Sequence, residues 1–369
     1  MDPGRLGTYQ ALADAHGSAH DDAARDIGSM LPAFGRSSPT AAQVTGMVTL
    51  LARECREGQR QGIAAVADEF LTMVSKPDAR DHGQSLPMSA PAPSCLSHDT
   101  LMSSLLPDTA QAPLLDVAAM LWETISKLVR QDPETLGLSA RDRLTARTSH
   151  PIRALADRVA RSFGDLRFDL YLNTSTAGTG RLLPGDPPAL VLPPGFEDQP
   201  EVEQAATLAR LLTYLALDIS WIEEVPASDV DGILFGAMRV GTGLWGQGEL
   251  SPSAEMNVGL WRQRMVKAVK AASRKIRRAL EESAHRLHAP ADSSAWRDAM
   301  QITGLRAAFV VTGDLRTALN QAMQLVPDLA GVHGPTLATK LFAQPLTREL
   351  VVFALSDTAM NLRRTAGTS

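Results

Sequence analysis

Cysteine and aromatic residues are scarce in this chain of 369 residues. The two cysteines, Cys55 and Cys95, are far apart and form no Cys-x-x-Cys pair, which predicts two reduced thiols and no disulfide framework. Aromatic residues make up only 5% of the chain, whereas Ala and Leu recur throughout. This balance favours helices over sheets, because Ala and Leu have high helix propensity and strands prefer β-branched and aromatic residues.

Long apolar runs and a strong net charge are also missing. No segment reaches the roughly 18 uninterrupted apolar residues that a membrane span needs, and the first residues contain no apolar signal core. The net charge of -5 differs from the positive balance of a dedicated nucleic-acid binder. We therefore expect a cytoplasmic protein without a transmembrane segment, whose 44% of apolar residues are enough for a substantial core.

The chain divides by composition into three segments. Residues 1–76 are expected to be helical, with a helical hairpin whose two apolar stripes are separated by Glu57-Gly58-Gln59. Residues 77–112 are rich in Pro, Ser, Ala and Gly, which predicts a linker with one short helix near Leu101–Leu106. Residues 113–369 are expected to form a helix-rich domain. The hairpin stripes are Val44, Val48, Leu51 and Cys55, and then Ile63, Val66, Ala67, Phe70 and Val74.

The expected fold class of the long third segment is mainly α with a small β-sheet (α+β). Two short strands are indicated by the alternation over Leu166–Leu172 and by the apolar run Pro188–Leu192, with a Gly/Pro loop between them. Helical spacing predicts seven helices around these strands, at 114–131, 152–163, 200–217, 229–240, 255–288, 291–303 and 313–325, and an eighth at 346–364.

The order strand, loop, strand and acidic-capped helix resembles the core of zincin metallopeptidases of the small gluzincin type. In that family an edge strand lies along the substrate cleft and the next helix carries His-Glu-x-x-His, which binds zinc and activates water. The resemblance places the edge strand at Pro188–Pro194 and the helix at Glu201–Leu217. Arg210-Leu211-Leu212-Thr213-Tyr214 stands where the zinc motif belongs, and no histidine occurs from residue 151 to residue 284. The resemblance thus implies a degenerate, zincin-like C-terminal domain without catalytic residues, metal ligands or cofactor, and we expect purified protein to contain no stoichiometric zinc.

Residues 114–366 also resemble the C-terminal region of large uncharacterised helical-repeat proteins of gliding soil bacteria. Three segments carry this resemblance: Asp186–Leu192, Arg306–Leu319 with its Thr312-Gly313-Asp314-Leu315, and Glu349–Arg364 with its Phe353-Ala354-Leu355-Ser356-Asp357. That family is bacterial and implies no specific activity.

Other motifs that suggest metal or phosphate binding have simpler interpretations. His16 and His20 have the i, i+4 spacing of metal ligands, but their glycine-interrupted region is expected to be a solvated helix end. His285 and His288 lie in a basic helix, whose field disfavours a cation. The glycines of 241–248 follow a helix and lack the Gly-Lys-Ser/Thr of a phosphate loop, so this stretch is expected to be a helix connection.

The most concentrated charge lies in the expected helix at 255–288, which has nine basic and three acidic residues. The remainder of the chain then has a net charge of -11, because -5 minus +6 is -11. An apolar stripe of Leu260, Val266, Val269, Ile276 and Leu280 is expected to pack on the domain and turn the cations outward. The predicted partner-binding residues are Arg262, Arg264, Lys267, Lys270, Arg274, Lys275, Arg277 and Arg278.

Three functions remain open from the sequence. The favoured one is a non-enzymatic interaction or regulatory module that binds an unknown, acidic protein partner through the basic helix. The alternatives are a hydrolase with an unrecognised active site, and a binder of nucleic acid or anionic membrane. A solvated helical face, or a tether paired with the acidic remainder of the chain, would explain the basic helix without any partner.

Overall fold

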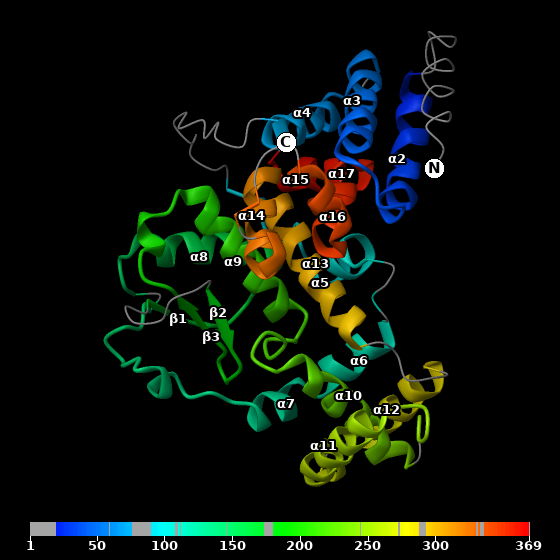
Figure 1. Ribbon diagram of the computed structural model, residues 1–369. Helices are drawn as coiled ribbons and strands as arrows, with labels where there is room; N and C mark the ends of the chain where they lie inside the picture. The colour runs from blue at the N-terminus through cyan, green and yellow to red at the C-terminus, as the bar shows by residue number, and fades with distance from the viewer. Residues whose placement is uncertain are drawn as a thin grey trace. The chain divides into compact units, whose positions relative to one another are not determined.

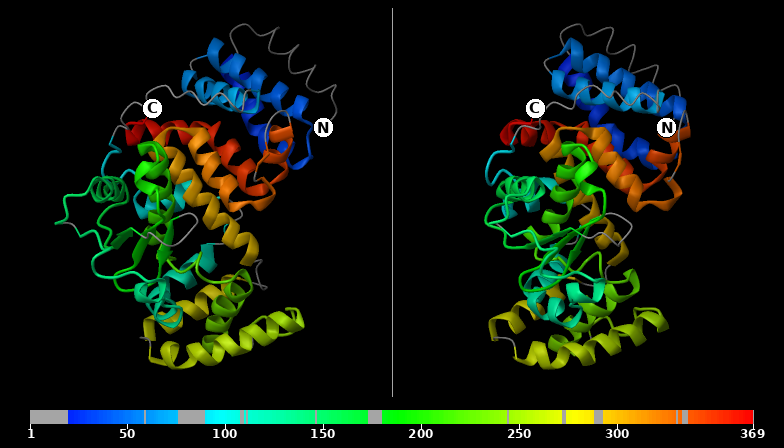
Figure 2. Two further views of the ribbon diagram at one scale, coloured as in Figure 1. Left: turned by 60° about the vertical axis from the view of Figure 1, so that its left-hand side comes forward. Right: turned by 90° about the vertical axis from the view of Figure 1, so that its left-hand side faces the viewer.

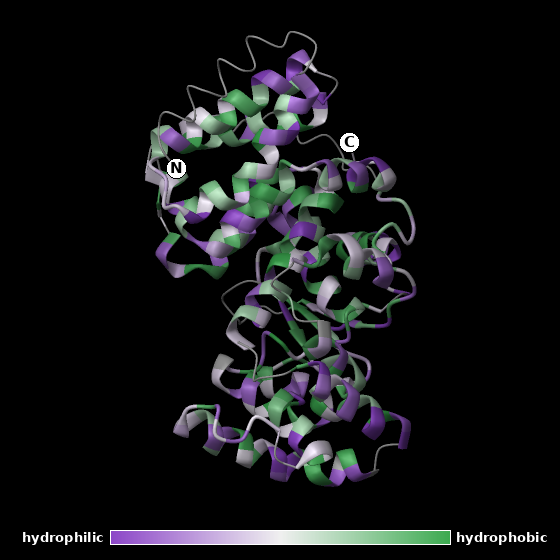
Figure 3. Cartoon of the chain, turned by 90° about the vertical axis from the view of Figure 1, so that its right-hand side faces the viewer, coloured by the Kyte–Doolittle hydropathy of each residue, from purple (hydrophilic) through white to green (hydrophobic). Residues whose placement is uncertain are grey.

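The computed structural model combines many helices with one small sheet, as predicted (Figure 1). Hydrophobic and hydrophilic residues alternate along the helices, which is the pattern of helices that bury one face (Figure 3). The structure describes residues 20–58, 60–75, 90–107, 110, 112–145, 147–172, 180–243, 245–271, 274–287, 293–329, 331–332 and 336–368.

The chain forms two compact units, each built from separate stretches of sequence. Unit 1 comprises Met1–Cys95, Pro200–Thr207 and Leu305–Ser369. Unit 2 comprises Leu96–Gln199 and Leu208–Gly304. The boundaries at residues 76 and 112 remain predictions.

Unit 1 is helical in the part that the structure describes. The predicted hairpin is confirmed as α3 and α4, and α3 begins with a capping box in which Thr40 and Gln43 satisfy each other's backbone N–H groups. The rings of Phe34 and Phe70 both pack edge-on against Phe342 in the core of this unit. Its helices are α2 (His20–Arg36), α3 (Ala41–Glu57), α4 (Gln61–Ser75), α14 (Leu315–Leu325), η4 (Pro327–Leu329), α15 (Thr336–Ala343), α16 (Pro345–Ala354) and α17 (Asp357–Ala366).

Unit 2 surrounds the sheet with helices, two of which replace the single basic helix expected from the sequence. The helix predicted over 114–131 is interrupted at Leu121, where a new helix starts. These helices are α5 (His98–Thr100), η1 (Leu101–Leu105), α6 (Ala112–Met120), α7 (Trp122–Leu128), η2 (Pro133–Leu136), α8 (Pro151–Phe163), η3 (Phe196–Asp198), α10 (Ala227–Thr242), α11 (Pro252–Ala271) and α12 (Arg274–Arg286). Two further helices, α9 (Glu201–Ala216) and α13 (Ser293–Thr312), contribute residues to both units.

The sheet has three strands, one more than the sequence predicts. Its order is β1 (Asp169–Leu172), β3 (Ala189–Leu192) and β2 (Arg181–Leu183). β3 pairs in parallel with β1 and antiparallel with β2, so it is the central strand. The expectation that this strand is an edge strand open to a substrate is therefore wrong, because its backbone groups are bonded on both sides.

The second half of the segment expected to be a linker is packed structure. Leu96, Leu101 and Leu105 are fully buried, and the backbone N–H of Leu96 donates to the carbonyl of Ser162. These leucines supply the apolar burial that the Pro- and Ser-rich composition does not indicate. The first half, residues 77–89, lies outside the described residues.

Both cysteines are buried. Burial raises the pKa of the Cys55 thiol to about 12, so this side chain is inert at neutral pH. No described helix is long and apolar enough to cross a membrane.

Candidate functional site

The helix that resembles the zincin zinc helix uses the motif positions for internal packing. Arg210 and Tyr214 lie one turn apart on α9, and both side chains are buried in unit 2. The Arg210 guanidinium forms an ion pair with the carboxylate of Glu223 and lies near the Tyr214 ring, 6.0 Å from its centroid. Burial raises the pKa of the Tyr214 hydroxyl, which therefore stays neutral. This cluster holds a cation of the protein itself and has no metal ligand set.

The predicted basic surface is exposed in full. All eight predicted partner-binding residues, defined here as the basic surface, have exposed side chains on α11 and α12. Arg278 pairs with Glu282 one turn away, and the Arg264 guanidinium stacks over the Trp261 ring. The other six form no ion pair within the described part of the chain; they are Arg262, Lys267, Lys270, Arg274, Lys275 and Arg277.

Close helix packing holds α11 on α10 (Figures 1 and 2). A Cβ atom at Gly232 would lie 2.2 Å from the Trp261 ring, and one at Gly236 would lie 2.8 Å from the backbone nitrogen of Arg262. Only glycine at these two positions, one turn apart on α10, permits this approach. Arg239 at the end of α10 fixes the start of α11 by donating to both carboxylate oxygens of Glu255, at 2.5 and 2.8 Å. These bonds hold the pKa of Glu255 below its usual range.

The outward side of α11 carries apolar residues as well as cations. Leu260 is 51% exposed and Met256 is 69% exposed, so the prediction that Leu260 packs on the domain is wrong. The inward face is formed instead by Val258, Trp261, Met265 and Val269. With about 100° of rotation per residue, one arc of roughly 80° contains the exposed residues of the outer face of α11. They are Pro252, Met256, Leu260, Gln263, Lys267 and Lys270.

Helix α12 is anchored at its C-terminal end. The indole N–H of Trp245 donates to the carbonyl oxygens of Ala284 and Leu287, at 2.9 and 3.0 Å, and so satisfies acceptors that a helix end leaves open. Arg286 pairs with Asp116 of α6. Both helices of the basic surface are therefore fixed to unit 2 by their buried sides.

The sheet of unit 2 borders a cavity of about 260 Å³. Its lining includes Asp132, Glu134 and Asp186, together with the Arg143–Asp169 ion pair of 2.5 Å. Tyr171 also lines the cavity, and burial raises the pKa of its hydroxyl. The described lining contains no histidine or cysteine that could act as a base or nucleophile.

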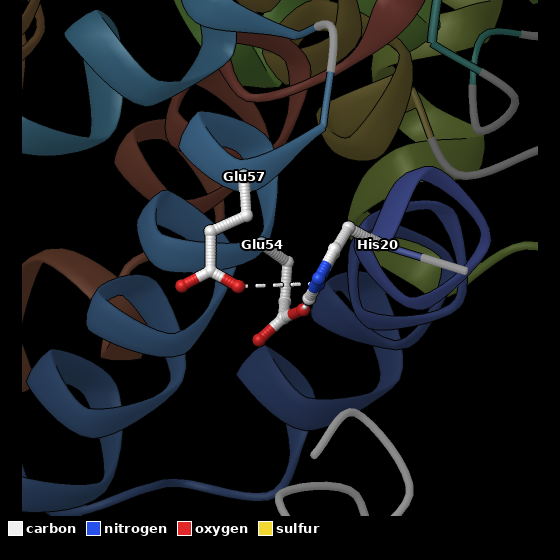
Figure 4. Close-up of side chains that lie close together, drawn as sticks. All are labelled: His20, Glu54 and Glu57. Carbon is white, nitrogen blue, oxygen red and sulfur yellow. Dashed lines mark hydrogen bonds and ion pairs between the residues drawn. The ribbon is translucent and has the colours of Figure 1, made fainter. Parts of the chain in front are cut away.

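A second charged cluster, which sequence analysis missed, lies between α2 and α3 in unit 1 (Figure 4). The Nδ1 atom of His20 lies 2.8 Å from Oε2 of Glu54 and 3.3 Å from Oε2 of Glu57. Glu54 is fully buried, and its other oxygen accepts from Arg53 at 2.7 and 2.9 Å. The hydrogen bond that His20 donates to the Glu54 carboxylate raises the pKa of His20. Burial would raise the pKa of Glu54, but the bonds from His20 and Arg53 outweigh it and lower that pKa.

The other motifs are described only in part. His285 is exposed on α12, whereas His288 and His16 lie outside the described residues. The glycine-rich stretch 241–248 lies between α10 and α11, as expected for a helix connection. Leu244 in this stretch lies outside the described residues. Arg239 donates to the carbonyl oxygens of Trp245 and Gly246 and so anchors this loop.

No protein-family model, curated protein or solved structure matches this chain.

Proposed function

We propose that the chain is a non-enzymatic interaction module whose basic surface binds an acidic protein segment. The observation that carries this proposal is that six cations of α11 and α12 are exposed and unpaired with any described residue. If the basic helices were instead tethered to acidic residues of the same chain, these cations would be paired with carboxylates. Their exposure leaves their field available to an anionic partner, in a chain whose other residues are net acidic.

The outer face of α11 supports a protein partner rather than nucleic acid. Met256 and Leu260 are exposed one turn apart, and Lys267 lies on the same arc two turns after Leu260. Apolar anchors surrounded by charge are typical of protein interfaces, whereas duplex backbones are recognised mainly by cations and hydrogen-bond donors. The partner segment is therefore expected to combine carboxylates with apolar side chains, as an amphipathic acidic helix does.

The resemblance to zincins is compatible with this function. The motif positions on α9 hold a buried ion pair, and the cavity beside the sheet has no described histidine or cysteine in its lining. We infer a scaffold that resembles the metallopeptidase type in its strand-to-helix order but has β3 as its central strand, and that serves binding.

The test uses a fluorescent helical peptide with leucines on one face and glutamates on the other. We expect it to bind wild-type protein more weakly as salt rises, because the Debye length falls from about 10 Å at 0.1 M to about 3 Å at 1 M. Replacing Lys267, Lys270, Arg274 and Arg277 with Gln should weaken binding at least tenfold. M256S/L260S should also weaken it, whereas neutralising four exposed arginines elsewhere in unit 2 should not; these controls are Arg141, Arg147, Arg161 and Arg167.

Three outcomes can contradict the proposal. A duplex oligonucleotide or phosphatidylserine vesicles that bind more tightly than the peptide would show an anionic-surface binder. Equal loss of peptide binding in the control variant would show that net charge, and no particular surface, attracts the peptide. Peptide hydrolysis by the protein would favour the hydrolase.

A further inference from the structure

We propose that His20, Glu54 and Glu57 bind a divalent transition-metal ion of the zinc type, which joins α2 to α3. The proposal is independent of the basic surface, because these residues belong to unit 1. It replaces the expectation of a zinc-free chain, which rested on α9 and on the histidine-free stretch from 151 to 284.

The donor atoms have the spacing of a coordination site. Zinc bonds of about 2.0–2.2 Å place two ligand atoms of one ion roughly 3–3.5 Å apart. The Nδ1 atom of His20 lies 2.8 and 3.3 Å from the two nearest carboxylate oxygens, and all three ligand atoms lie within 4.8 Å of one another. Glu57 is about half exposed, so its carboxylate can rotate by the small amount that coordination requires.

Neighbouring side chains orient the Glu54 carboxylate so that one of its oxygens can bind a metal ion. Arg53 occupies Oε1 of this buried carboxylate with two hydrogen bonds, and Oε2 is left facing His20. Outer-shell donors of this kind fix the orientation of ligands in metal sites. The two glutamates lie one turn apart on α3, and His20 is the first residue of α2, so two rigid elements supply the three ligands.

The ligand set selects the kind of ion. One imidazole nitrogen and two carboxylate oxygens suit zinc and similar first-row ions, whereas magnesium and calcium prefer oxygen alone. The two carboxylates carry two negative charges, and Arg53 offsets one of them. A divalent cation is therefore attracted more strongly than a monovalent one, and it replaces the proton that His20 shares with the carboxylates.

The experiment measures zinc binding by calorimetry on metal-stripped, full-length protein without a histidine tag. We expect one zinc per chain, and at least tenfold weaker binding in His20→Asn and in Glu57→Gln. The matched controls are H285N, which removes another exposed histidine, and D22N, which removes an exposed carboxylate of α2. Both should bind zinc as the wild type does. Circular dichroism of each variant checks that the helices persist.

Two further readouts separate this site from adventitious binding. Zinc should raise the melting temperature of wild type and D22N but not of E57Q, because only the former gain a link between α2 and α3. X-ray absorption of the zinc-loaded protein should show one imidazole and otherwise oxygen ligands. Three results would each overturn the proposal: no zinc binding by the wild type, zinc binding by H20N and E57Q as tight as by the wild type, or displacement of zinc by equimolar magnesium.

Discussion

Two helical regions of unit 2 carry conspicuous charge, and they place it in opposite environments. On α9 the Arg210 side chain is 1% exposed and neutralised by Glu223, so its charge acts only within the protein. On α11 and α12 the cations are exposed, and most are unpaired within the described chain. A charge that is already neutralised inside the fold contributes to structure, whereas an exposed and uncompensated one attracts a partner. Burial therefore separates the two roles where charge density alone does not.

The largest effect is expected from breaking the buried pair on α9. Arg210→Met leaves the Glu223 carboxylate in a largely buried position without its cation, and should lower the free energy of unfolding by about 3–5 kcal/mol. The double variant R210M/E223M should recover part of this loss, because no unpaired charge remains. Urea unfolding measures both. A loss below about 1 kcal/mol for R210M would show that α9 tolerates a missing charge as the basic surface does.

The next effect concerns the support of the basic surface. Gly236→Ala places a methyl group 2.8 Å from the backbone nitrogen of Arg262, so α11 must move away from α10. We expect a loss of about 1–3 kcal/mol in thermal or urea unfolding. Gly259→Ala is the matched control on α11, because a Cβ there meets nothing within 4 Å. It should be neutral, or should stabilise the helix by about 0.5–1 kcal/mol. Equal effects of the two variants would contradict the close packing of α10 and α11.

Elements whose signal is local in the sequence were predicted, whereas an element that depends on long-range pairing was not. Apolar spacing predicted α3, α4, α8 and α9 well, because a helix repeats its buried face within the sequence itself. The strand β2 has only three residues, and its pairing depends on a strand that follows it, so the sequence did not indicate it.

The candidate sites divide in the same way. Exposure of the basic surface followed from local charge density, although Leu260 was assigned to the wrong side of its helix. His20 was considered only with His16, because its carboxylate partners lie 34 and 37 positions further along the chain. One signal was present. Glu54 lies three residues after Leu51 on the apolar side of α3, and a carboxylate on a buried face requires a partner.

A buried carboxyl of unit 1, that of Glu69, is expected to make the stability of the protein depend on pH. Glu69 accepts from the backbone N–H of Arg316 at the start of α14, and burial, with the nearby Asp314 carboxylate, raises its pKa to about 7. The folded state then holds a proton that the unfolded state releases above about pH 4.5, so stability falls as pH rises from about 4.5 to 7. Glu69→Gln should remove this part of the pH dependence. The free energy of unfolding of the variant, measured against that of wild type, should therefore be about 1–2 kcal/mol higher at pH 8 than at pH 5. Denaturation across this pH range is the measurement, with the exposed Glu123→Gln as control. A stability profile that E69Q leaves unchanged would show that Glu69 is not protonated in the fold.

The smallest change in stability is expected for a variant of the basic surface, although its effect on peptide binding should be large. K267Q/K270Q/R274Q/R277Q removes four exposed cations that form no ion pair with a described residue, and Arg278 is left intact because it pairs with Glu282. Surface charges without partners contribute little to folding, and their mutual repulsion opposes it. The free energy of unfolding should therefore change by less than about 0.5 kcal/mol. The same variant should lose at least tenfold in affinity for the acidic amphipathic peptide. A clear fall in melting temperature with unchanged peptide binding would show that these cations pair with the acidic remainder of the chain in solution. In that case α11 and α12 would resemble α9, since their charge would serve the fold alone.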